Sequence, residues 1–78
     1  MSILDLARSE EQLIIQDTED HVKSKRDILP IMLTMSSTSA YVCPEGTTEG
    51  KFLVGENVRE VSRQVREYVR TLINPLLN

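Results

Sequence analysis

GENVREVSRQVREYVRTLINPLLN (residues 55–78) ends the chain and contains its clearest secondary-structure signal. Asn57 is a favourable N-cap residue, and Glu60 follows it at the spacing of a capping box. Pro75 comes directly after Asn74, and a residue that precedes proline avoids the helical conformation. These signals predict a helix that begins after Asn57 and ends at Asn74.

An apolar stripe runs along this predicted helix. Its members recur at alternating spacings of three and four residues, which places them on one helical face. They are Val58, Val61, Val65, Tyr68 and Leu72, and Val69 and Ile73 widen the same face. We expect the stripe to form the core of the chain or a contact with a second copy.

Four arginines form a second stripe on the same helix, namely Arg59, Arg63, Arg66 and Arg70. The helical repeat centres this stripe about 130° from the middle of the apolar one, so the arginine stems can cover the edge of the core. One interpretation is structural, with the guanidinium groups paired to acids at little gain in stability. The other is a surface for an acidic partner or an anion, because guanidinium binds carboxylates and phosphates through paired hydrogen bonds.

The four arginines differ in whether an acid lies one helical turn away. Glu67 lies one turn after Arg63, whereas Arg66 and Arg70 have no acid four residues away. We therefore expect a structural role for Arg63 and recognition by Arg66 and Arg70. The net charge is −3 overall, with −3 in residues 1–29, −1 in residues 30–55 and +1 in residues 56–78. This distribution predicts that the acidic N-terminal segment meets the arginine-rich helix.

The N-terminal segment is predicted to be helical up to about Lys25, since it contains no glycine or proline. Ser2 and Asp5 are placed to begin the helix, with the acid in its first turn. The apolar pattern beyond them is irregular. Asp17 and Thr18 are suitable residues to start a second helix, so one bent helix and two short ones both remain open.

The middle of the chain predicts strands. In ILPIMLTM (28–35), Pro30 disfavours a helix, and the short apolar run after it predicts a buried strand of about five residues. A helix over residues 28–36 is the main alternative. SSTSA (36–40) is a polar link.

Residues 41–43 and 51–54 flank PEGTTEG (44–50) and predict a hairpin with a long loop. Pro44 is expected to set the first turn position, and Gly46 and Gly50 to provide positive φ where the loop requires it.

The whole chain of 78 residues is predicted to form one small α+β domain. Its N-terminal helical segment and long C-terminal amphipathic helix would pack on a short antiparallel sheet or hairpin. A chain this short has a small core. Cys43 is the only cysteine and His21 the only histidine, which excludes an intrachain disulfide and a zinc site of four Cys and His ligands. Self-association is the remaining way to bury more surface, so we expect a homodimer or larger assembly that involves the C-terminal helix.

Several classes of function are disfavoured by the residues present. The sequence pI of about 5.0 and the three aromatic residues are atypical of a nucleic-acid-binding domain. Cys43 has no neighbouring base to activate it, and no other motif points to a reaction. DTEDH (17–21) lacks the glycine and the length of a calcium loop. We therefore expect no enzyme activity, no metal and no cofactor.

The expected location is the cytoplasm. No apolar run approaches the ~20 residues of a membrane span, and one unpaired cysteine suits a reducing compartment. The function that we expect is that of a small, non-catalytic, homo-oligomeric protein that binds or inhibits a larger protein partner. Stand-alone proteins of this size are often accessory factors of viruses, phages or mobile elements, and such a role is an expectation from length alone. The alternative is an oligomer that binds an anionic small molecule or nucleotide through the arginines of its C-terminal helix.

Overall fold

The structure, a computed structural model, describes the backbone of residues 3–77 and the side chains of residues 10–77. The predicted start of the first helix at Ser2 lies outside the described residues. Within them, two helices and three strands follow one another in the order α1 (Ile3–Lys23), β1 (Ile31–Met35), β2 (Ser39–Pro44), β3 (Lys51–Val54) and α2 (Val58–Leu77). The predicted α+β fold is confirmed.

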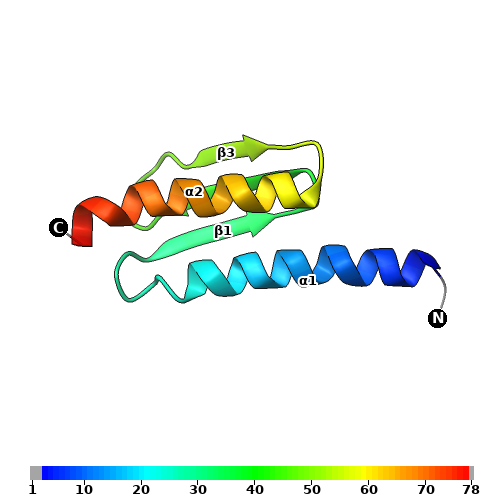
Figure 1. Cartoon of the computed structure of the whole chain (residues 1–78). Coiled ribbons are helices and arrows are strands. Elements are labelled where there is room, and N and C mark those ends of the chain that lie inside the picture. The colour runs from blue at the N-terminus through cyan, green and yellow to red at the C-terminus, as the bar shows by residue number, and fades with distance from the viewer. Residues whose placement is uncertain (1–2, 78) are drawn as a thin grey trace.

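The strands form one antiparallel sheet in the order β1-β2-β3, and the two helices pack on it. α1 contacts β1, and α2 contacts β2 and β3. The helices also contact each other and run in the same direction (Figure 1). Alternate strand residues therefore face the helices, and the others face away from both.

α2 begins as its capping signals predict. The backbone N–H of Glu60 donates a hydrogen bond of 2.9 Å to Oδ1 of Asn57. The Glu60 carboxylate in turn accepts a 3.0 Å hydrogen bond from the N–H of Glu56, one residue earlier than in the standard capping box. Both bonds satisfy N–H groups that would otherwise lack a partner near the helix start.

The predicted end of this helix at Asn74 is wrong, because α2 continues to Leu77 with Pro75 inside it. Pro75 has no N–H to donate to the carbonyl of Thr71, one turn earlier. Only one helical hydrogen bond is lost in this way, and the backbone keeps its helical geometry for the last two residues. The last turn adds Leu76 and Leu77, which are 55% and 64% exposed.

α1 is a single helix, which decides between the two alternatives for the N-terminal segment. Thr18 starts no second helix. Its hydroxyl donates a 2.7 Å hydrogen bond to the carbonyl of Ile14 one turn earlier, and its side chain is fully buried against α2. The tertiary contact therefore overrides the local preference of Asp17 and Thr18 for a helix start.

Residues 31–35 form a strand rather than a helix, as predicted, but the strand is not buried on both faces. Ile31 is 2% exposed, whereas Met32 is 62% exposed. The helices cover only one face of the sheet, so every second residue of β1 lies on the open face. The polar link shortens to residues 36–38, and the N–H of Ser36 donates to the carbonyl of Ser39 at 2.8 Å.

The predicted hairpin of residues 41–43 and 51–54 is confirmed as part of the β2–β3 pair. Pro44 is the last residue of β2 and the first of a turn closed by the N–H of Thr47, which donates to its carbonyl at 3.3 Å. Gly46 is the third residue of this turn and has φ of 88°, a value that favours glycine. Gly50 is needed for another reason, because a Cβ there would lie 2.5 Å from the Tyr41 ring.

The core lies between the sheet and the two helices. Val61 and Val65 of α2 and Val42 of β2 are each 0% exposed. With the remaining buried apolar side chains of the cluster, all five elements contribute: Val22, Ile31, Ala40, Leu53, Val69 and Ile73. The core is made of small β-branched and aliphatic side chains and contains no aromatic ring, although Tyr68 packs at its edge.

Candidate functional site

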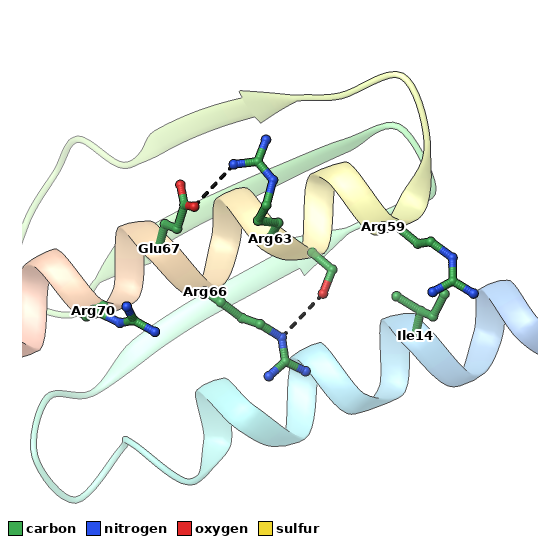
Figure 2. Close-up of a pocket in the computed structure, with 7 residues that line it drawn as sticks. Ile14, Arg59, Arg63, Arg66, Glu67 and Arg70 are labelled. Atoms are coloured by element: carbon green, nitrogen blue, oxygen red, sulfur yellow. Dashed lines mark hydrogen bonds and ion pairs between the residues drawn. The ribbon is translucent and has the colours of Figure 1, made fainter.

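The four arginines of α2 follow one another along the helix, and the structure separates them into two pairs. Arg59 forms an ion pair with Glu10 of α1, and Arg63 forms one with Glu67 at 3.2 Å. Figure 2 shows Arg63 and Glu67 pointing away from α1. These pairs are well exposed and contribute little to stability. Arg66 and Arg70 form no ion pair with the side chains of residues 10–77.

Arg66 is positioned by a chain of hydrogen bonds that crosses between the helices. Its Nε donates to Oγ of Ser62 at 3.4 Å (Figure 2). The hydroxyls of Ser62 and Thr18 lie 2.6 Å apart in the core. Because Thr18 uses its single hydroxyl hydrogen on the carbonyl of Ile14, Ser62 must be the donor to Thr18. The chain therefore runs from Arg66 through two buried hydroxyls to the backbone of α1.

The C-terminal end of α1 and the turn after it bring two more bases to Arg66 and Arg70. His21 and Lys25 lie with them around a hollow of about 300 Å³ between the helices, and we call it the basic hollow. The remaining wall is formed by four α2 residues: Val69, Ile73, Asn74 and Leu77. None of the described residues that line this hollow carries a carboxylate side chain.

A second hollow of about 390 Å³ adjoins the basic hollow and lies closer to the start of α2. We call it the arginine hollow. It contains all four arginines, with Ile14 and Ser62 between the helices and Glu67 at its outer rim (Figure 2). It shares Arg66 and Arg70 with the basic hollow. The two hollows differ in charge balance, because Glu67 offsets part of the charge in the arginine hollow only.

The electrostatics of the basic hollow are visible at His21. Partial burial, Arg66, Lys25 and Arg70 together lower the pKa of His21 below its ordinary value of 6.5. Burial disfavours the charged imidazole, and each nearby cation repels the proton that would charge it. Burial first and the three cations second therefore favour the neutral imidazole where the two helices meet.

The predicted contact between the acidic N-terminal segment and the arginine-rich helix is only partly present in the structure. Glu10 reaches Arg59, but one end of the helix pair brings bases against bases. The sequence pattern did not identify His21 and Lys25 as site residues. The signal that could have found them is their spacing from Ile14 and Thr18, since residues 14, 18, 21 and 25 follow one face of a helix.

The apolar stripe of α2 lies inside the chain. Val58, Val61 and Val65 are buried, and Tyr68 and Leu72 are half-buried at the edge of the core. The fully buried face is rotated toward α1, where it takes in three further residues: Ser62, Val69 and Ile73. The stripe is therefore largely covered by the sheet and α1 of the same chain.

A different surface has no cover in the chain: the face of the sheet opposite the helices. Four large side chains are exposed on it, and the strand register places Met32 in β1, Tyr41 in β2, and Phe52 and Val54 in β3 on the same side. Their exposed fractions are 62%, 41%, 64% and 61%. The other strand residues on this face are uncharged too: Thr34, Ser39 and Cys43.

Cys43 and His21 are the residue types that most often serve as nucleophile and base, and they lie in opposite layers of the fold. Cys43 is on the open face of the sheet, where its thiol lies 3.7 Å from Oγ1 of Thr47. His21 is on α1, in the helical layer. Among the described side chains, no three His, Cys, Asp or Glu residues are grouped closely enough to hold a metal ion. Within residues 3–77, neither helix is both long enough and apolar enough to cross a bilayer.

Comparison of the chain with protein-family models, with curated proteins and with solved structures finds no match in any of the three. Two surfaces of the molecule therefore bear on its function. One is the open, uncharged face of the sheet, and the other is the pair of hollows between the helices.

Proposed function

We propose that the protein is a small, non-catalytic interaction protein that works as a homodimer joined through the open face of its sheet. The observation that carries this proposal is the composition of that face. An antiparallel sheet that faces water on one side normally alternates apolar and polar residues. Here Met32, Tyr41, Phe52 and Val54 give the outer face an apolar character as well, which is typical of a sheet covered on both sides.

A second copy of the chain fits this face better than a charged partner does. The outward strand residues include no Asp, Glu, Lys or Arg, so a partner of opposite charge would find nothing to pair with. The chain as a whole has a net charge of −3, and two copies can approach most closely where that charge is absent. Two such faces would pack as the layers of a β-sandwich do, with interdigitating side chains.

The area available is consistent with a dimer of moderate affinity. At the exposed fractions given above, the four large side chains offer on the order of 500 Å² per copy. Two copies would then bury about 1,000 Å², near the lower limit of specific interfaces. Tyr41 and Phe52 also border a shallow hollow of about 160 Å³ that can receive a side chain from the facing copy.

The dimer assigns different roles to the two layers of the fold. With the sheets joined, α1 and α2 of each copy would face outward, so a larger protein partner would meet the helices and their arginines. The single thiol of Cys43 would lie within the joined faces, which suits a reducing compartment such as the cytoplasm.

The test is sedimentation of the full chain at micromolar concentration with two matched variants. Phe52→Lys places a charge on the open face, and Leu13→Lys places the same charge on α1 at a side chain that is also 64% exposed. We expect the wild type and Leu13→Lys to sediment as two chains and Phe52→Lys as one chain of 8.9 kDa. All three should keep the same helical circular dichroism.

Two results would overturn the proposal. One is a wild-type monomer throughout the micromolar range. The other is a Phe52→Lys variant that stays dimeric, because the copies would then meet elsewhere, for example through the outer edge of β1.

A further inference from the structure

The basic hollow concentrates positive charge that nothing in the described structure neutralises. Lys25, Arg66 and Arg70 form no ion pair with the side chains of residues 10–77, in contrast to Arg59 and Arg63. Their charges repel one another across a hollow whose described lining residues include no Asp or Glu. An anion placed between them would remove that repulsion and accept hydrogen bonds from all three.

The rest of the hollow is not suited to a bare inorganic ion alone. Val69, Ile73 and Leu77 form an apolar wall beside the bases, and the amide of Asn74 adds a polar group to it. A lining that places an apolar wall beside convergent charged and polar groups suits a small organic anion. The occupant should therefore carry an apolar part next to its anionic group.

We propose that the basic hollow binds a small organic phosphate, with Lys25, Arg66 and Arg70 contacting the phosphate oxygens and the wall of Val69, Ile73 and Leu77 contacting the organic part. The volume of about 300 Å³ lies at the small end of the range for ligand sites. A compound the size of a nucleoside monophosphate suits it. The inference does not depend on the homodimer, since every lining residue belongs to one chain and to the helical layer.

Arg66 is held in place before any ligand arrives. Its Nε is bonded to Ser62, which is bonded to Thr18 on the facing helix. A guanidinium that is already oriented loses less conformational entropy when it binds a phosphate. Its two terminal nitrogens are left to contact the ligand, because the bond to Ser62 uses only Nε. After partial burial, these same three cations are what lowers the pKa of His21.

The experiment is calorimetric titration of the full chain with adenosine 5′-monophosphate, adenosine and inorganic phosphate as probes. We expect saturable binding of the nucleotide with submillimolar affinity, weaker binding of inorganic phosphate and none of adenosine. Added sodium chloride should weaken the nucleotide complex, since salt screens exposed charges.

The variants separate a built site from general attraction to a basic surface. Arg66→Gln, Arg70→Gln and Lys25→Gln should each weaken nucleotide binding about tenfold, because each removes a charged hydrogen-bond donor. Arg63→Gln is the matched control: it removes the same charge one turn away, where the guanidinium is paired with Glu67, and should change affinity by less than about twofold. Leu77→Ser should weaken the nucleotide about threefold and leave inorganic phosphate unchanged.

Three outcomes would overturn the inference. The first is no saturable binding of the nucleotide below 1 mM, roughly the weakest affinity of a specific small-molecule site. The second is an Arg63→Gln variant as impaired as Arg70→Gln, which would indicate charge attraction without a site. The third is equal affinity for inorganic phosphate and nucleotide, which would exclude a role for the apolar wall. The monomeric Phe52→Lys variant should bind the nucleotide as the wild type does, so failure of the dimer and failure of this site can be told apart.

Discussion

Thr18 of α1 and Ser62 of α2 share a hydrogen bond of 2.6 Å in the core, between hydroxyls that lie 44 positions apart in the sequence. Thr18 is 0% exposed and Ser62 is 7% exposed, and each also bonds a third group. The described buried side chains leave no nitrogen or oxygen without a partner. This pair therefore fixes how the two helices sit against each other at no cost in unsatisfied polar atoms.

The energetic weight of this pair can be measured with a double-mutant cycle. Thr18→Val and Ser62→Ala should each lower the free energy of unfolding by ~1–3 kcal/mol, because each leaves the other hydroxyl buried with one bond fewer. The double variant should lose clearly less than the sum of the two, since both polar groups are then gone. Urea denaturation of the four proteins gives the values. Strict additivity would show that the two hydroxyls do not stabilise each other.

The centre of α2 should tolerate no charge. Val65 is 0% exposed and belongs to the core cluster, so Val65→Asp would bury a carboxylate without a partner. We expect a loss of ~3 kcal/mol or more in the free energy of unfolding, and so a loss of helical circular dichroism. Thr71→Asp is the control on an exposed position of the same helix and should cost under ~0.5 kcal/mol. Equal melting of Val65→Asp and the wild type would contradict the packing of this helix.

Much of the fold follows from local signals in the sequence. Asn57 and Glu60 predict the start of α2 because capping depends on residues within one turn. The hairpin around Gly46 is predicted for a similar reason, since turn geometry restricts the residue types that fit. Pro75 predicted too early an end for α2. The helix continues for two residues past it, and the proline removes only one helical hydrogen bond.

The candidate site depends on tertiary placement, which local signals do not contain. The apolar stripe alone gives the face of α2 but cannot show which flank a second helix covers. α1 packs on the flank that carries Ser62, and this polar residue has no place in an apolar pattern. Once α1 is placed, His21 and, in the turn after the helix, Lys25 lie beside Arg66, so the acidic N-terminal segment contributes bases to the site.

Three of the four arginines should matter little for stability. Arg59→Gln, Arg63→Gln and Arg70→Gln each remove an exposed charge, and we expect changes under ~1 kcal/mol. Arg70→Gln should be neutral or slightly stabilising, because it relieves repulsion from Arg66 and Lys25 in the basic hollow. Thermal melting at low and high salt checks this: salt should raise the stability of the wild type and leave Arg70→Gln less affected. A loss of more than ~2 kcal/mol in Arg70→Gln would make that arginine a structural residue.

The last prediction concerns pH and the only histidine. The pKa of His21 in the folded chain lies below its ordinary value of 6.5, owing to burial and to the charges of Arg66, Lys25 and Arg70. Between the folded and the unfolded pKa the unfolded chain binds more protons, so stability falls as pH drops through 6.5 and is unaffected by His21 above it.

His21→Gln should remove this particular loss. Both proteins will lose stability in acid as carboxylates titrate, so the quantity to compare is the difference in free energy of unfolding between them from about pH 7.5 to pH 5. That difference should move in favour of His21→Gln as the pH falls. A bound phosphate should reverse the sign, because an anion beside His21 favours the protonated imidazole and raises its pKa. A pH-independent difference between the two proteins would mean that His21 does not sense the bases around it.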